Sequence, residues 1–224
     1  MKFALYVIGF ILAALIIPFL IPTSGDGSDP ERNLPWQIEV DAQGGSKVFG
    51  LQPGLSTLAD VKAALGNELE VAIIAQPNEV GMIEAYYSQV ALGFVLAKMV
   101  LTLDLDQEAV NAMRERALKA KHMESTTRKI TLHPDDLARL EQQRIKAFAV
   151  IPTVNLDEAT VVQRFGQPEE RIQVSEKRVH LLYPRQGLDI VVDGDGKELL
   201  QYVAPRDFRL LRDPLMAASA GKQG

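Results

Sequence analysis

Cysteine is absent from this chain of 224 residues. Its absence excludes disulfides, cysteine-ligated zinc, iron–sulfur clusters, cysteine nucleophiles and a lipid-modified cysteine near the N-terminus. The net charge is -5 and no run of lysine and arginine stands out, so the electrostatic footprint of a nucleic-acid-binding protein is missing. Neither G-x-x-x-x-G-K-[ST] nor G-x-G-x-x-G occurs, so nucleotide binding has no motif.

Residues suited to catalysis or metal binding are few and scattered. The histidines His122, His133 and His180 lie in different predicted elements without H-x-x-x-H or H-x-H spacing, which favours surface or turn positions. The DGDGKE run at 193–198 has Lys197 at position 5, where a calcium loop needs an acidic or amide ligand, so we predict a hairpin turn there. We therefore predict no catalytic residue, no cofactor and no metal, and expect that the chain is not an enzyme.

One long apolar run is present, at the start of the chain. Phe3 to Pro22 is twenty residues without a charge, long enough as a helix to cross about 30 Å of hydrocarbon. A cleaved signal peptide is the competing interpretation, but its apolar stretch is usually about 7–15 residues, and only a poor Thr/Ser/Gly cleavage site follows here. We predict that residues 1–22 form a transmembrane signal anchor and that this segment contacts the lipid bilayer.

The charges on either side of this run predict its orientation. Lys2 precedes the apolar segment, whereas Asp26, Asp29 and Glu31 follow it. The positive-inside rule then directs the C-terminal part away from the cytoplasm. We expect a single-pass protein of the bacterial inner membrane with its body in the periplasm.

A linker and a short hairpin are expected next. Residues 23–35 are rich in Gly, Ser, Asp and Pro, the composition of a solvated spacer. Trp36, Ile38 and Val40 alternate with polar residues before a Gly-Gly turn, so a hairpin at 36–50 is predicted. Trp36 has two interpretations, packing on a strand or lying at the bilayer interface, where indole is favoured.

Two segments one hundred residues apart share a pattern. ADVKAALG at 59–66 and ATVVQRFG at 159–166 carry Ala, Val and Gly at the same relative places. Thr57 and Asp157 can each cap a short helix, and Gly66 and Gly166 can each end one. We therefore predict two copies of one unit, each beginning with a capped helix.

Strand-like runs follow each predicted helix and indicate antiparallel meanders. A tyrosine in the second run recurs as Tyr87 and Tyr183, and a glycine opening the next run recurs as Gly93 and Gly187. The alternative for YYSQVALGFVLAKMVL is a buried helix, because periodicity does not separate the two for an apolar run. Whether the two units share one sheet is left open.

The fold class expected is α+β, with an N-terminal transmembrane helix and two repeated units of a helix and an antiparallel meander, joined by a two-helix segment. The predicted connecting helices are Asp106 to Lys121, with Asp106 as its N-cap, and Pro134 to Phe148, with the strand STTRKITLH between them. The expected divisions are 36–105 for the first α+β repeat, 106–150 for the connecting helices, 151–212 for the second α+β repeat and 213–224 for a disordered tail.

The helical start of each unit, followed by a meander with an aromatic residue and a Gly-Leu pair, resembles the BamE/SmpA family of outer-membrane assembly lipoproteins. It also resembles the related tandem fold of the beta-lactamase inhibitor protein. The residues carrying the resemblance are Gly54, Ser56 or Thr57, Val61 and Gly66 in the first copy and Val161, Gly166, Pro168, Tyr183, Gly187 and Leu188 in the second.

This chain departs from the family at three points. Asn67 and Glu68 stand where the first copy should continue as Gly-x-Pro, the second copy lacks the glycine before its helix, and no lipobox cysteine is present. The resemblance implies a protein-binding module without an active site. With the predicted anchor, it implies a periplasm-facing interaction module that assists assembly or stability of an envelope complex by binding other envelope or inner-membrane proteins.

Two other functions are weighed against this one. In the first, the chain is a single-span accessory subunit of a membrane enzyme, with the small residues Gly9, Ala13 and Ala14 allowing close helix approach. In the second, it is an envelope hydrolase, which needs a convergent nucleophile and base that no local motif supplies.

Overall fold

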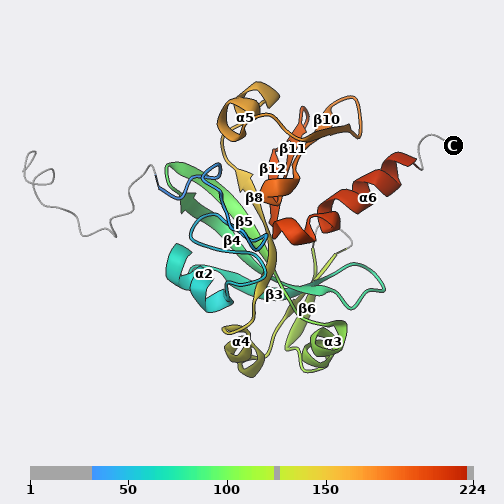
Figure 1. Cartoon of the computed structure of the whole chain (residues 1–224). Coiled ribbons are helices and arrows are strands. Elements are labelled where there is room, and N and C mark those ends of the chain that lie inside the picture. Colours follow the sequence, from blue (N-terminus) through green and yellow to red (C-terminus); the bar gives the residue numbers. More distant parts are fainter. Residues whose placement is uncertain (1–31, 124–126, 221–224) are drawn as a thin grey trace, which may run out of the picture. The chain divides into compact units, whose positions relative to one another are not determined.

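The computed structural model describes residues 32–123 and 127–220 (Figure 1). Within these residues the fold is α+β, as predicted, with five α-helices and a ten-stranded antiparallel sheet. The predicted membrane segment Phe3 to Pro22 lies outside the described residues. Among the helices that are described, none has the length and apolar character needed to cross a membrane.

The strands of both predicted units belong to one ten-stranded sheet, so the two units share a sheet. In their order across the sheet they are β6 (Lys119–His122), β7 (Arg128–Thr131), β3 (Glu70–Ala75), β4 (Met82–Leu92), β5 (Val95–Leu103), β8 (Ile145–Pro152), β12 (Leu199–Val203), β11 (Leu188–Asp193), β10 (Arg178–Tyr183) and β9 (Glu170–Gln173). Because β4 and β5 are strands, the buried-helix alternative for this run is wrong.

The helices are α2 (Leu58–Leu65), α3 (Gln107–Glu115), α4 (Pro134–Leu140), α5 (Glu158–Phe165) and α6 (Arg209–Ala220). The expected hairpin at 36–50 is present as β1 (Glu39–Val40) paired with β2 (Ser46–Lys47). Trp36 precedes this hairpin and lies in a turn rather than in a strand.

The helices α2 and α5 begin and end as the sequence predicts. Thr57 caps α2 in a capping box with Asp60, and the carboxylate of Asp157 accepts a hydrogen bond from the Thr160 N–H at 2.8 Å. Each helix has eight residues and ends at a glycine, Gly66 with φ of 92° and Gly166 with φ of 85°. Glycine is favoured at both ends because L side chains rarely adopt this backbone conformation.

The same tertiary contact holds each helix end against the sheet. The Tyr87 hydroxyl on β4 donates to the Gly66 carbonyl at 2.6 Å, and the Tyr183 hydroxyl on β10 donates to the Gly166 carbonyl at 3.0 Å. Both rings are buried. The residues that the sequence pairs by spacing therefore make equivalent hydrogen bonds.

The strand register also relates the two halves of the sheet. Aligning Tyr87 with Tyr183, and following their partners across the next two strands, aligns Val150 on β8 with Tyr202 on β12. The preceding residues, Ala149 and Gln201, are then equivalent, and they are also each other's partner between β8 and β12. Antiparallel pairing of equivalent residues is the arrangement that an approximate two-fold axis through the middle of the sheet produces.

The two faces of the sheet have different coverings. The inner face packs against α2, α5 and the segment before α2 in one core, which includes Val61, Val161, Phe49 and Tyr202. The outer face is covered by α6 over one half, where Phe208, Leu211 and Leu215 pack on residues including Leu182 and Val203. Figure 1 shows α2 and α6 on opposite sides of the sheet.

The predicted connecting segment 106–150 needs correction. Asp106 caps α3 as expected, its carboxylate accepting from the Ala109 N–H at 2.7 Å, but α3 ends at Glu115 and residues 119–122 form β6. The helix α4 ends at Leu140, and Ile145 and Phe148 belong to β8. Pairing with neighbouring strands on both sides of β8 outweighs the helical spacing of these apolar residues.

The predicted disordered tail 213–224 is also wrong for its first part, because α6 extends through residue 220. Two interactions order this helix. Leu211 and Leu215 pack against the outer face, and the Arg212 guanidinium binds the Glu170 carboxylate at 2.9 Å. Residues 221–224 lie outside the described part of the chain.

Candidate functional site

The three histidines lie apart, and one of them is buried. His122 is exposed on the edge strand β6, and His133 caps α4, with its imidazole accepting from the Asp135 N–H at 3.3 Å. His180 on β10 is 8% exposed, so the expected surface or turn position is wrong for this residue. Its place in a near-continuous apolar run, which is typical of a strand buried on both faces, was the signal for burial.

His180 belongs to a small polar cluster on the outer face of the second half. Its Nδ1 lies 2.8 Å from the Asp189 carboxylate, which also accepts from the Gln201 amide at 3.1 Å. The three side chains come from the adjacent strands β10, β11 and β12. In the part of the chain that the structure describes, no group of three or more metal-ligating residues is found.

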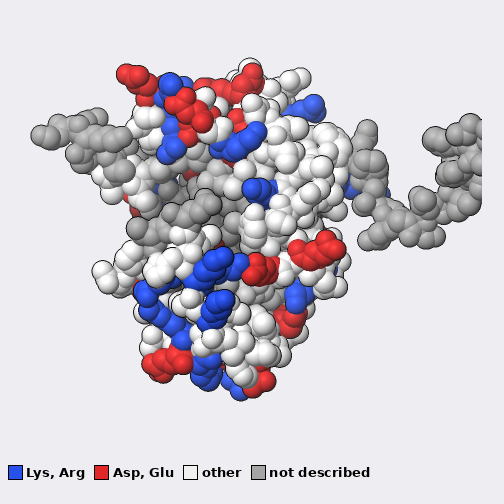
Figure 2. All heavy atoms as spheres, turned by 180° about the vertical axis from the view of Figure 1, so that it is seen from behind, with Lys and Arg blue, Asp and Glu red and all other residues white. Residues whose placement is uncertain are grey.

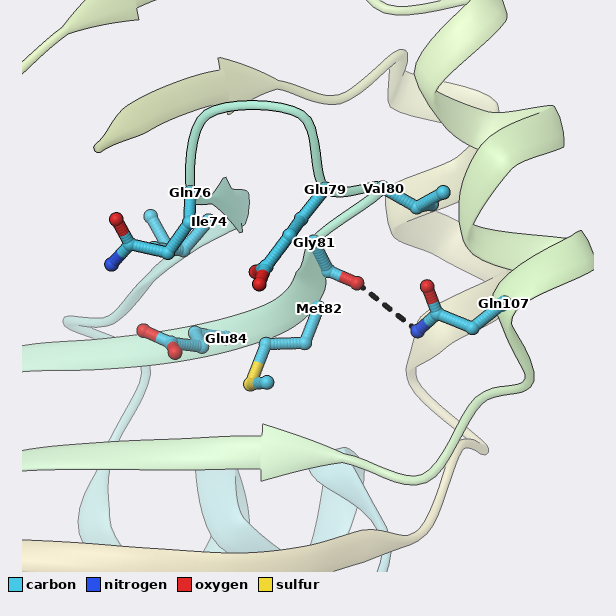
Figure 3. A pocket seen from close by; sticks show the side chains of 8 residues that line it. All are labelled: Ile74, Gln76, Glu79, Val80, Gly81, Met82, Glu84 and Gln107. Carbon is cyan, nitrogen blue, oxygen red and sulfur yellow. Dashed lines mark hydrogen bonds between the residues drawn. The ribbon is translucent and has the colours of Figure 1, made fainter. Parts of the chain in front are cut away.

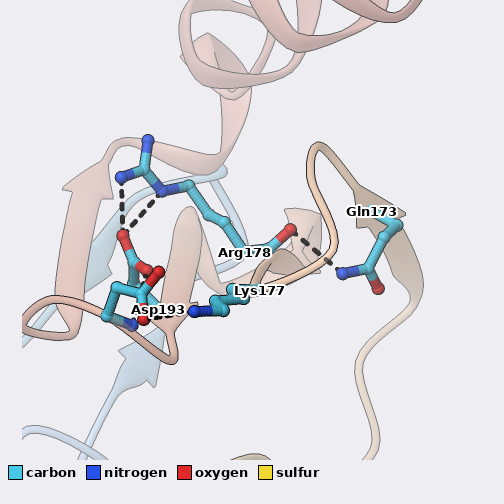
Figure 4. A network of polar contacts seen from close by, with 5 residues as sticks. Gln173, Lys177, Arg178 and Asp193 are labelled. Carbon is cyan, nitrogen blue, oxygen red and sulfur yellow. Dashed lines mark hydrogen bonds and ion pairs between the residues drawn. The ribbon is translucent and has the colours of Figure 1, made fainter.

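The acidic loop at 193–198 is a hairpin turn, as predicted. The Asp193 carboxylate accepts from the Asp195 N–H at 3.1 Å and from the Arg178 guanidinium at 2.8 Å, and Lys177 pairs with Asp195 at 2.8 Å. Figure 4 shows Arg178 and Lys177 meeting this loop from the neighbouring turn. The hydrogen bond from Arg178 lowers the pKa of Asp193. Both aspartates of the loop are thus bound to cations of the chain itself.

The first half of the outer face carries a groove that is our candidate site. It has a volume of about 350 Å³. We call it the outer groove; its lining is Glu70, Ala72, Ile74, Glu84, Tyr86, Val100, Met123 and Lys129. Its floor comes from β3, β4 and β5, where alternate residues point away from the inner core.

A second hollow of about 390 Å³ continues the outer groove, sharing Ile74 and Glu84 with it. It lies under the turn between β3 and β4 (Figure 3), where the Glu79 side chain descends toward Glu84 and Met82. The helix α3 fixes this turn, because Gln107 donates to the Gly81 carbonyl at 3.2 Å and Arg114 donates to the Glu79 carbonyl at 2.8 Å.

The charges around the outer groove are uneven. Glu84 lies on its floor, and burial raises the pKa of this carboxyl group. No ion pair joins Glu84 to a cation among the described residues, whereas Glu70 at the rim is paired with Lys129 at 2.5 Å. Lys119 and Lys121 are exposed on β6, which pairs with the strand of Lys129, and the three lysines form a basic rim on this side of the outer groove. Figure 2 shows lysine and arginine side chains gathered over the lower half of the molecule.

The chemical character of the outer groove follows from its lining. The lining of the outer groove combines apolar side chains with two carboxylates and one ammonium group, and it includes neither a histidine nor a serine. A bound segment would gain contact with the apolar floor and could place a cation beside Glu84.

Sequence reasoning found none of these residues as a site. The available signal was the alternation of β3 and β4, which puts Glu84 and Tyr86 on the face opposite the core residues Ile83 and Tyr87. The alternation can be read from the sequence, but it identifies a groove only when the strand order is known, because the lining comes from three strands.

No protein-family model, no curated protein and no solved structure matches this chain.

Proposed function

We propose that this chain is a protein-interaction module, anchored in the bacterial inner membrane and facing the periplasm, that assists assembly or stability of an envelope complex. The outer groove is its partner-binding surface in this proposal. The observation that carries it is a largely apolar sheet surface that the described residues leave uncovered, beside the half that α6 covers. The apolar run Phe3 to Pro22 supports the anchor.

The chemistry of the outer groove limits the partner. Tyr86 and Val100 offer apolar contact, and Glu84 is a partly buried carboxylate for which burial raises the pKa. A partner segment with apolar side chains and one lysine or arginine would cover the floor and pair with Glu84. The lysines of the rim favour further acidic residues at the ends of that segment.

We further infer that the sheet arose by duplication of one unit, α2 with β3, β4, β5 and β8, matched by α5 with β9, β10, β11 and β12. The paired Tyr–Gly hydrogen bonds and the register through Ala149 and Gln201 support this relation. In this interpretation, α3, β6, β7 and α4 are an insertion in the first unit. The tandem arrangement is in keeping with the resemblance to the BamE/SmpA and beta-lactamase inhibitor protein folds.

Co-purification tests the proposal. The full-length chain, expressed at native level, is extracted from membranes in mild detergent, and proteins held by it are identified. We expect the double variant Tyr86→Ser/Val100→Ser to lose the partner, while Leu55→Ser retains it, because Leu55 is 58% exposed and does not line the outer groove. A partner retained by the groove variant, or a chain without any partner, would contradict the proposal.

Exchanging the anchor separates this function from its alternative. If the chain is a single-span accessory subunit that binds through its membrane helix, replacing residues 1–22 by an unrelated span abolishes association. If the outer groove carries binding, association survives the exchange. An envelope hydrolase gains no support from the lining of the outer groove.

A further inference from the structure

Apolar side chains gather at one end of the sheet, outside the outer groove. Phe94 lies at the turn between β4 and β5 and is 59% exposed, Leu96 follows it at 44%, and Val154 after β8 is 51% exposed. The segments that carry Leu96 and Val154 run side by side at this end of the sheet, because the Thr153 N–H donates to the Leu96 carbonyl at 2.9 Å. With Trp36, these residues form what we call the apolar tip.

Trp36 is built into the apolar tip by its ring contacts. Its ring lies 5.9 Å from Phe94 and 6.2 Å from Phe165, measured between centroids. The Arg164 guanidinium lies over the indole at 4.9 Å. A cavity of about 200 Å³ opens among Trp36, Phe94, Arg164 and Val154. Tryptophan is enriched at membrane interfaces, where its apolar ring can contact lipid while its N–H stays near water.

The chain enters the folded body beside this tip. Leu34 is buried, and the Tyr202 hydroxyl donates to the Pro35 carbonyl at 3.0 Å, so the entry point is fixed to the core. Nine residues, 23–31, separate Arg32 from the apolar run that ends at Pro22. A chain of nine residues reaches about 30 Å at most.

We propose that the apolar tip docks on the lipid bilayer, with Trp36 and Phe94 at the level of the headgroups. This inference rests on the membrane anchor of the proposed function. Nine residues between the tip's entry point and Pro22 keep the tip within reach of the membrane that the anchor would span. Arg164 and Lys197 lie near the tip, where their charges can meet lipid phosphates. Docking would hold the body in one orientation and restrict how the outer groove is presented.

Trp36 is the single tryptophan of the chain, which makes the test direct. The full-length chain is reconstituted into phosphatidylcholine and phosphatidylglycerol vesicles, with or without bromine on the acyl chains near the headgroups. We expect brominated lipid to quench the emission of Trp36. Equal emission in the two kinds of vesicle would overturn the proposal. Evidence that a partner protein, instead of lipid, covers the tip would overturn it as well.

Two variants distinguish docking of the apolar tip from quenching that arises only because the short spacer holds Trp36 near the membrane. Leu96→Ser/Val154→Ser keeps the contact between Trp36 and Phe94 and is expected to lose quenching. Leu55→Ser, which changes an exposed leucine near the opposite end of β8, is expected to keep it. Quenching that persists in the tip variant would overturn the proposal. Each variant is compared with itself in plain vesicles, so a change of tryptophan environment cancels.

Alkaline carbonate extraction distinguishes failure of this inference from failure of the proposed function. A chain that stays with the membrane under carbonate but shows no quenching is anchored without docking, and only the inference fails. A chain released by carbonate has no integral anchor, and both fail. Co-purification of a partner through the outer groove is measured independently of either result.

Discussion

Removing the hydroxyl groups of Tyr87 and Tyr183 tests whether the two halves of the sheet are built alike. Each hydroxyl donates to the carbonyl of the glycine that ends a helix, Gly66 or Gly166, at 2.6 Å and 3.0 Å. Replacing either tyrosine by phenylalanine keeps the buried ring and deletes one hydrogen bond. Because both glycines are exposed, water can reach their carbonyls in the variants, and each substitution should cost about 0.5–1.5 kcal/mol.

The two costs should add. The two contacts share no partner and lie in different halves of the sheet, so the double variant should lose about 1–3 kcal/mol of the free energy of unfolding. That is a measurable part of the roughly 5–15 kcal/mol expected for a domain. Urea denaturation of the full-length chain in detergent, followed by Trp36 fluorescence, gives the values.

A third tyrosine supplies the control. Tyr86 is next to Tyr87 but faces the outer groove, and we find no hydrogen bond for its hydroxyl among the described residues. Tyr86→Phe should change the free energy of unfolding by less than about 0.5 kcal/mol. A loss in Tyr87→Phe or Tyr183→Phe that is no larger than in this control would refute the equivalence of the two contacts.

The same pair predicts a pH dependence. Burial raises the pKa of Tyr87 and Tyr183 to about 12 in the folded chain, whereas tyrosine in an unfolded chain ionises near about 10. The stabilisation that comes from holding these two hydroxyl groups neutral in the folded chain is therefore complete below about pH 10 and is lost as the pH rises toward about 12. In the double phenylalanine variant this alkaline loss should be smaller, with the remainder coming from Tyr202, whose pKa burial also raises.

Two further predictions concern the outer face. Burial raises the pKa of Glu84, so ionisation of this carboxyl group destabilises the folded chain at pH values above the ordinary glutamate range and has no effect where the folded and unfolded states are both protonated. Glu84→Gln should therefore stabilise the chain at pH 7.5 but not at pH 3.5, as measured by urea denaturation. An equal effect at both pH values would contradict this. Phe208 is 5% exposed and packs with residues of α6, so Phe208→Ala should lower the free energy of unfolding by about 3–5 kcal/mol. Leu210 is at an exposed position of α6, so Leu210→Ala should change the free energy of unfolding by less than about 0.5 kcal/mol. Similar losses in the two variants would show that α6 does not pack as described.

Local chemistry made the helix ends predictable. Thr57, Asp106 and Asp157 are each followed at the third position by a residue whose N–H their side chain accepts, and such caps depend only on near neighbours. The strand after each glycine was also predictable, because its turn residues and β-branched residues are local signals.

Tertiary pairing decided what the sequence did not show. Ile145 and Phe148 have helical spacing, yet β5 and β12 pair with their segment from both sides and make it a central strand. The helix α6 is ordered by its contact with Leu182 and by the ion pair of Arg212 with Glu170. The outer groove could not be predicted for the same reason, because its lining depends on which strands become neighbours.

Site-specific photocrosslinking in living cells is the most direct test of the central claim that the outer groove binds a partner protein. A photoreactive amino acid is placed at Val100, on the floor of the groove, or at Leu55, an exposed control position outside its lining. We predict a covalent adduct with one envelope protein from position 100 and none from position 55. An absence of adducts from position 100, or the same adducts from both positions, would contradict the account.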